Sequence, residues 1–161
     1  MKEEEEYKKI LNLLQEDQNN IKMFFDKKIT LEEMKIKNEE ISKEFKYFVR
    51  DNGFPFKNIV SEEIYKASFA LSLHLPIKDL KDMFDKIRDS DSDKFPLSDK
   101  VFFIDKIRIA DGKPQLYGTQ TKRSENNEIC LVEVEDEENL EKRRQEVGLE
   151  SVSEYLKKFK K

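Results

Sequence analysis

His74 is the one histidine in this chain of 161 residues, and imidazole is the side chain that ordinarily exchanges protons near neutral pH. It is therefore the natural candidate for a general acid or base. Helical spacing aligns His74 with Leu71, Ala67 and Ile64, which predicts that the ring faces inward. Three roles are open to such a histidine: catalyst, ligand-binding group, or hydrogen-bonded member of the core.

A second polar group is the run Tyr117-Gly118-Thr119-Gln120. Its two hydroxyls and its amide can donate and accept hydrogen bonds, and Gly118 allows the backbone to come close to a partner. This composition suits the wall of a polar pocket, with Tyr117, Thr119 and Gln120 as ligand-binding residues. The alternative is a tight turn whose side chains are satisfied locally.

Charged side chains complete the set of candidates. Asp105 shares a predicted helix face with apolar residues, which places a carboxylate near the core. This carboxylate would orient His74 for catalysis, or pair with Arg143 or Arg144. Such a pair would fasten the C-terminal helix to the body of the domain. The two arginines would otherwise hold a carboxylate or phosphate of a ligand.

The elements that must position these residues are mostly helices. The chain has 4 glycines and 4 prolines and is rich in residues that favour helices. Apolar spacing and capping residues predict helices over about residues 3–26, 30–52, 62–75, 77–87, 97–109, 137–146 and from 151 onward. Strand-like runs at 115–121 and 129–134 predict a β-hairpin. We therefore predict a mainly α fold, a single-domain bundle (1–161) of six or seven helices with a small β-hairpin between the fifth helix and the C-terminal helices.

The segment that begins at Thr30 has two patterns of its own. Thr30-Leu31-Glu32-Glu33 fits a capping box. A seam then follows at alternating steps of three and four, with one polar member, Asn38: Leu31, Met34, Asn38, Ile41, Phe45 and Phe48. A long coiled coil would show this pattern, but a helical hairpin packed on the domain explains it more simply.

Charge and cysteine content exclude several classes of protein. The chain has 31 Lys and Arg against 35 Asp and Glu, a net charge of −4. This balance argues against a nucleic-acid partner, because nucleic-acid binding depends on basic surface. The single cysteine, Cys130, and the single histidine exclude a disulfide framework and Cys- or His-based metal clusters. We expect no metal, and without a phosphate loop or dinucleotide fingerprint we expect no cofactor.

The sequence also predicts a cytoplasmic protein. No window approaches the roughly 18 apolar residues of a membrane span, so we expect no membrane partner. The first residues, with Glu3 to Glu6, are acidic, whereas a secretory signal needs a basic start and then an apolar core. The sequence leaves open whether the protein is a monomer or a dimer.

Three stretches carry a resemblance to other proteins. They are Gly53-Phe54-Pro55, Gly112 to Gln120 with the pattern Gly-x-Pro-Gln-x-Tyr-Gly-Thr-Gln, and Arg143 to Leu149 with the pattern Arg-Arg-x-x-Val-Gly-Leu. With these stretches the chain resembles a bacterial domain family of unknown function. The resemblance covers about residues 38–157 and leaves the N-terminal helix, residues 1–28, outside. It implies a shared fold more than a shared activity.

Our leading hypothesis for the function is a binding or regulatory domain for a small polar or anionic ligand, or for a peptide end. The pocket would lie between the His74 end of the third helix and the Tyr117–Gln120 turn. Asp105, Arg143 and Arg144 would lie nearby.

Two alternatives stay open. One is a hydrolase or transferase that uses His74 as general base, with Asp105 as the group that orients the imidazole. The other is a protein-interaction module of an inhibitor or immunity-like kind, which would bind its partner through the seam between Leu31 and Phe48.

Overall fold

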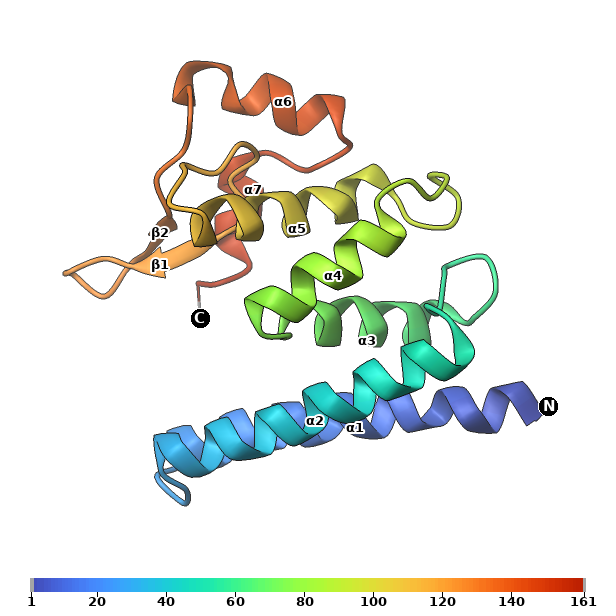
Figure 1. Ribbon diagram of the computed structural model, residues 1–161. Helices are drawn as coiled ribbons and strands as arrows, with labels where there is room; N and C mark the ends of the chain where they lie inside the picture. Colours follow the sequence, from blue (N-terminus) through green and yellow to red (C-terminus); the bar gives the residue numbers. More distant parts are fainter. Residues whose placement is uncertain (1, 161) are drawn as a thin grey trace. The chain divides into compact units, whose positions relative to one another are not determined.

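The computed structural model describes residues 2–160, which contain seven α-helices and a two-stranded β-sheet (Figure 1). The prediction of a mainly α fold is confirmed, and the hairpin lies between the fifth helix and the C-terminal helices as expected. The chain divides into two compact units, Met1–Ile87 and Arg88–Lys161, and each is described by itself. Within the described residues, no helix combines the length and the hydrophobicity needed to cross a membrane.

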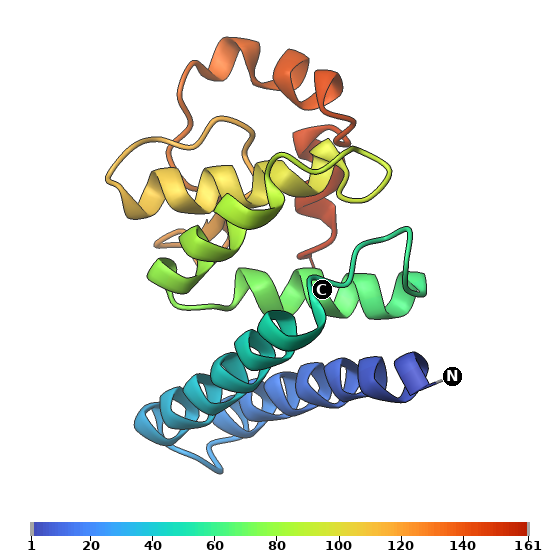
Figure 2. The same ribbon diagram turned by 45° about the vertical axis from the view of Figure 1, so that its right-hand side comes forward.

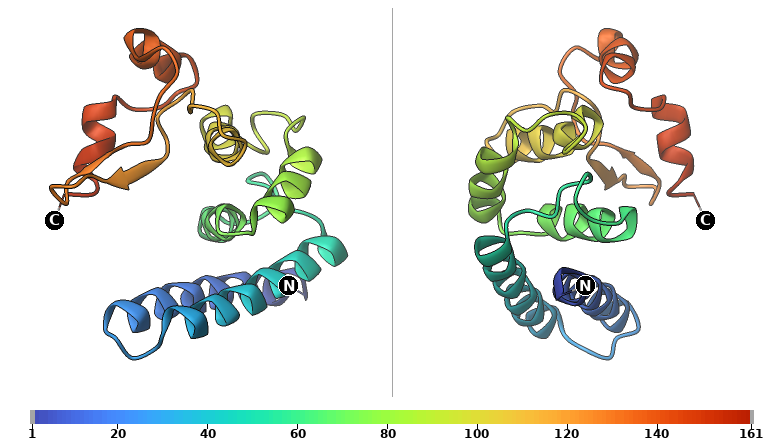
Figure 3. Two further views of the ribbon diagram at one scale, coloured as in Figure 1. Left: turned by 60° about the vertical axis from the view of Figure 1, so that its left-hand side comes forward. Right: turned by 90° about the vertical axis from the view of Figure 1, so that its right-hand side faces the viewer.

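The first unit consists of four helices: α1 (Lys2–Phe25), α2 (Leu31–Asn52), α3 (Glu62–Leu73) and α4 (Ile77–Ile87). α1 and α2 form an antiparallel helical hairpin, and α3 also packs against α1 (Figure 3). The buried apolar residues of these three helices include Ile10, Leu13, Ile41, Phe45, Phe48, Ile64, Ala67 and Leu71. The helical hairpin therefore accounts for the C-terminal half of the predicted seam, whereas Leu31 at its start is 48% exposed.

Local capping sets where two of these helices begin. The Thr30 hydroxyl accepts a hydrogen bond from the Glu33 N–H (3.1 Å), and the Glu33 carboxylate accepts one from the Thr30 N–H (2.7 Å), so the predicted capping box is present. The Ser61 hydroxyl accepts from the Ile64 N–H at the start of α3. That helix ends at Leu73, two residues earlier than predicted, and His74 follows it as the C-cap.

The second unit contains a longer helix, the hairpin and two short helices: α5 (Leu97–Ala110), β1 (Thr121–Arg123), β2 (Ile129–Leu131), α6 (Leu140–Glu146) and α7 (Val152–Lys157). The strands are antiparallel and pair Thr121 with Leu131 and Arg123 with Ile129. A 3-10 turn, Glu137–Asn139, leads into α6. The loop that follows α5 turns back along that helix before β1 begins (Figure 2).

The predicted strand over 115–121 is wrong for most of its length. Gln115 forms an isolated parallel bridge with Val134, and β1 begins only at Thr121. Between these points the backbone N–H groups point to the carboxylate of Asp105 instead of to a neighbouring strand. A positive φ of 64° at Gly118 also interrupts the extended backbone that a strand requires.

Candidate functional site

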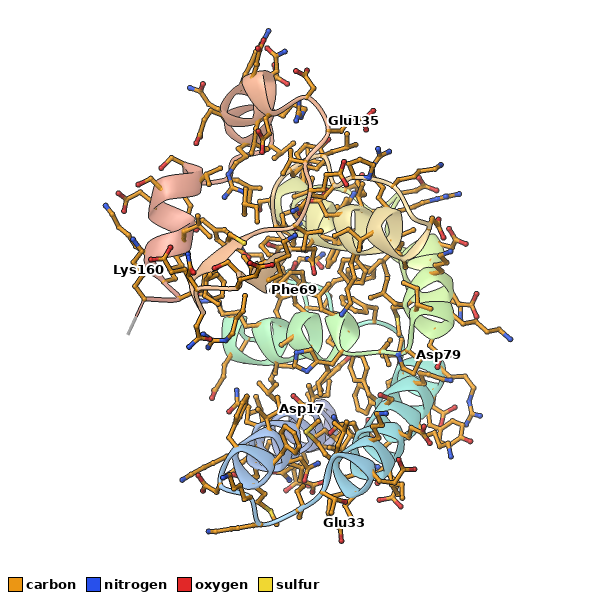
Figure 4. All side chains as sticks on the ribbon, turned by 90° about the vertical axis from the view of Figure 1, so that its left-hand side faces the viewer. Asp17, Glu33, Phe69, Asp79, Glu135 and Lys160 are labelled. Carbon is orange, nitrogen blue, oxygen red and sulfur yellow. The ribbon has the colours of Figure 1, made fainter. Side chains whose placement is uncertain are left out.

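His74 lies directly after the last residue of α3, and its ring is hydrogen-bonded to α1. The imidazole Nδ1 is 2.8 Å from Oδ2 of Asp17. The Asp17 side chain is only 4% exposed, whereas that of His74 is 46% exposed. In Figure 4, Asp17 lies on the side of α1 that faces α3. The prediction that His74 faces the core is therefore wrong, because the helical spacing on which it rests ends at Leu73.

The hydrogen bond to Asp17 determines which nitrogen of the imidazole is left to bind another group. A carboxylate accepts this hydrogen bond from the Nδ1–H group, and when the ring is neutral this tautomer leaves Nε2 as an acceptor. A buried carboxylate that fixes the tautomer of an exposed histidine is also the arrangement that orients a general base. Sequence reasoning assigned this orienting role to Asp105, and in the structure Asp17 makes the hydrogen bond to Nδ1.

A groove of about 300 Å³ opens beside this pair within the first unit. Helix α1 contributes two lining residues, α2 contributes five, and Leu71 and His74 complete the wall. Five of the lining side chains are apolar: Ile21, Met34, Ile41, Phe45 and Leu71. Four are polar: Asp17, Asn38, Ser42 and His74. An apolar wall with a few polar groups is the usual make-up of a small-molecule site.

Asn38 supplies an unusual feature of this groove. Its Oδ1 atom is buried and, among the described residues, has no hydrogen-bond partner. Leaving a buried acceptor unpaired costs about 1–3 kcal/mol, so such an atom calls for an explanation. Asn38 is the polar member of the otherwise apolar seam, and it lines the groove, so a rotation of its side chain would bring this acceptor to a donor in the groove.

The other predicted site residues gather in the second unit, around Asp105. This aspartate has no exposed surface. Its carboxylate accepts hydrogen bonds from the backbone N–H groups of Leu116 (2.7 Å), Tyr117 (3.1 Å) and Thr119 (3.0 Å), and from the Thr119 hydroxyl (2.9 Å). These four hydrogen bonds hold the loop after α5 in place. The acceptor atoms of the Asp105 carboxylate are therefore used within the protein.

The carbonyl groups of the same loop are bound by side chains that follow later in the chain. Arg143 Nε donates to the Leu116 carbonyl (2.8 Å), and Arg144 Nη1 donates to the carbonyls of Tyr117 (2.6 Å) and Gly118 (3.1 Å). Tyr155 donates its hydroxyl to the Thr119 carbonyl (2.6 Å). The two predicted ligand-binding arginines therefore bind the loop itself.

Burial accounts for the altered ionisation of two of these groups. Arg144 is 1% exposed, and removal from water lowers the pKa of its guanidinium. The same cause raises the pKa of the Tyr155 phenol, which keeps that group protonated and able to donate. The guanidinium carbon of Arg144 lies 5.1 Å from the centre of the Tyr155 ring, a distance typical of a cation–π contact.

Gln115 is a member of this network that sequence reasoning missed. It has no exposed surface, and its amide oxygen accepts from the Gln120 N–H (2.8 Å). Its amide nitrogen donates to the carbonyls of Gln120 (2.9 Å) and Val132 (2.8 Å). Gln120 in turn donates its own side-chain amide to Thr119. The signal that could have found Gln115 is its place inside the same Pro-Gln-x-Tyr-Gly-Thr-Gln stretch.

The geometry therefore separates two groups of candidates. In the second unit, Asp105, Gln115, Thr119, Arg143 and Arg144 hydrogen-bond within the protein, which favours the interpretation of a locally satisfied turn. In the first unit, the Asp17–His74 pair and Asn38 line a groove. Among the described residues, no group of three or more His, Cys, Asp or Glu is placed to hold a metal ion.

No family model, curated protein or solved structure matches this chain. The resemblance over residues 38–157 therefore stays a prediction.

Replacing Asp105 with Asn is expected to destabilise the second unit. The amide would keep one acceptor oxygen and turn an NH2 group toward backbone N–H donors, so at least one buried donor would be left unpaired. We expect the free energy of unfolding to fall by about 3 kcal/mol, measured by urea unfolding followed by circular dichroism. Glu125→Gln, the same loss of charge at an exposed position of the second unit, should change it little. Equal stability of both variants would contradict the role assigned to Asp105.

Gly118 and Gly112 allow a matched test of the loop. Both have a positive φ, 64° and 74°, so alanine at either position costs about 1–2 kcal/mol. A Cβ at position 118 would also lie 3.1 Å from Leu131 Cδ1, whereas one at position 112 would meet nothing within 4 Å. We expect Gly118→Ala to lower the free energy of unfolding by about 1 kcal/mol more than Gly112→Ala. An equal effect would mean that only the backbone conformation matters at position 118.

Proposed function

We propose that this protein is a binding domain for a small ligand or chain end, and that its site is the groove between α1, α2 and α3. The observation that carries the proposal is the unpaired buried acceptor of Asn38 on the wall that also holds the Asp17–His74 pair. A site for a ligand must leave polar groups for that ligand to satisfy. This wall contains such a group, whereas the hydrogen-bonding side chains around Asp105 already have partners within the protein: Gln115, Thr119, Gln120, Arg143 and Arg144.

The volume of the groove limits the size of the ligand. At about 300 Å³ it lies at the small end of the range for ligand pockets, which is roughly 300–1,000 Å³. The five apolar side chains would bind a short aliphatic or aromatic body, and the four polar ones would bind its head. The proposal keeps the binding function and the His74 side of the site that the sequence suggested, and it leaves the Tyr117–Gln120 turn out of the site.

Three six-carbon probes test whether the groove binds anything: hexylamine, 1-hexanol and hexanoic acid. Because His74 is the one histidine, its imidazole protons give an unambiguous NMR signal at the groove. We expect this signal to shift saturably with at least one probe. Ser42→Trp should fill the groove and weaken binding by about tenfold or more.

The control for that variant is Lys43→Trp, which places the same side chain at an exposed position one residue further along α2. It should bind the probe like the original protein. If none of the three probes moves the His74 signal, or if Ser42→Trp binds as well as Lys43→Trp, the groove is not a binding site.

A second candidate function is acid–base catalysis at the same place. The observation that favours it is the 2.8 Å hydrogen bond that the buried Asp17 carboxylate accepts from the His74 side chain, which is 46% exposed. In a hydrolase or transferase of this kind, Nε2 of His74 would accept a proton from water or from a substrate hydroxyl. Asp17 would hold the ring in the required tautomer and stabilise the imidazolium as it forms.

Hydrolysis of 4-nitrophenyl butyrate tests this candidate. A positioned general base contributes about 10²–10⁴-fold to a rate, so His74→Gln should lower turnover by about 100-fold or more, and Asp17→Asn should give an intermediate loss. Asp26→Asn, at an exposed position just after α1, should leave turnover unchanged. Hydrolysis that is equal in the original protein and in His74→Gln would exclude His74 as the base for this ester.

A further inference from the structure

We infer that the groove selects a ligand with a primary amine as its head and a short apolar tail. This inference rests on the proposed binding function and specifies the chemistry of the ligand. The sequence suggested a small polar or anionic ligand or a peptide end, and this inference favours a cationic head over an anionic one.

The polar atoms of the wall are mainly acceptors. Asn38 Oδ1 is an acceptor without a partner among the described residues. Asp17 is hydrogen-bonded to His74 through Oδ2, and a carboxylate has lone pairs for more than one donor. With the proton of the imidazole on Nδ1, Nε2 of His74 is an acceptor as well. A head that brings several N–H donors would satisfy these atoms together.

Charge favours the same kind of head. Among the described residues, the lining of the groove includes one carboxylate, Asp17, and neither lysine nor arginine. His74, the other titratable group of the wall, is already hydrogen-bonded to Asp17. An anionic head would therefore meet the Asp17 carboxylate without a lysine or arginine on the described part of the wall to offset it. An ammonium group carries three donors and a positive charge, so it complements both the acceptors and the carboxylate. Charge-assisted hydrogen bonds of this kind are also the stronger ones.

The apolar side chains of the wall favour a ligand with an apolar tail. Ile21, Met34, Ile41, Phe45 and Leu71 contribute side chains from three helices. Ile41, Phe45 and Leu71 are themselves buried, so they form a fixed surface and not a set of mobile exposed chains. A short alkyl or aromatic tail would lie against this surface and would remove the partly exposed side chains of Ile21 and Met34 from water. The amine would remain at the polar end with Asp17, Asn38 and His74.

The test compares the affinities of hexylamine, 1-hexanol and hexanoic acid, which share one tail and differ in the head. Dissociation constants would be measured at pH 7 from the His74 imidazole signal and from the backbone amide signal of Asn38. We expect hexylamine to bind at least about tenfold more tightly than hexanoic acid, with 1-hexanol in between. That ratio corresponds to about 1.4 kcal/mol.

Asn38→Leu tests the acceptor itself, because it keeps the volume of the side chain and removes both polar atoms. It should weaken hexylamine binding by about fivefold or more and leave 1-hexanol binding nearly unchanged. Since the variant also removes a buried unpaired acceptor, its melting temperature should rise. Asn12→Leu, at an exposed position on α1, should change neither the affinities nor the melting temperature.

The outcomes separate this inference from the proposal on which it rests. If hexanoic acid binds more tightly than hexylamine, or if all three probes bind equally, the inference is overturned while the groove remains a binding site. If no probe binds, the proposed function fails and the inference fails with it. If Asn38→Leu binds hexylamine like the original protein, Asn38 is not the group that selects the head.

Discussion

The carboxylate of Asp105 has no contact with water, and a charge in that position must be hydrogen-bonded within the protein. Its donors are three backbone N–H groups and one hydroxyl of a single loop, residues 116–119. Because the loop turns its N–H groups inward, its carbonyls need donors as well, and Arg143, Arg144 and Tyr155 provide them. One buried charge thus determines the course of the loop and the partners of α6 and α7.

In the first unit, not every buried polar atom is hydrogen-bonded within the described part of the protein. Asp17 is buried and is hydrogen-bonded to His74, but Asn38 Oδ1 has no partner among the described residues. Mutually satisfied polar groups stabilise a fold, whereas an unsatisfied group next to a groove is available to a ligand. This contrast is the reason why the proposed site lies beside His74 and not at the Tyr117–Gln120 turn, although that turn has the richer set of polar side chains.

Local patterns predicted the helices because they depend on neighbours in the sequence. The capping box at Thr30, the cap at Ser61 and the apolar spacing of α2 each involve residues three or four positions apart. The prediction of a strand over 115–121 is wrong because the conformation of this segment depends on a residue farther away in the sequence. Its alternation suits a strand, but its backbone donors are bound by Asp105, which is 11–14 residues away. The orienting partner of His74 was missed because Asp17 lies 57 residues earlier in the chain.

The sequence by itself determined the mainly helical fold, the place of the hairpin and the residues with a capacity for chemistry, His74 and Asp105 among them. These features follow from composition and from short-range spacing, which act through the backbone geometry of single elements. Only the tertiary structure decided which of these side chains use their hydrogen bonds to hold the fold and which line a groove. That distinction depends on contacts between distant segments, as in Asp17 with His74 and Asp105 with Thr119, and no local pattern encodes the partner of a buried polar atom.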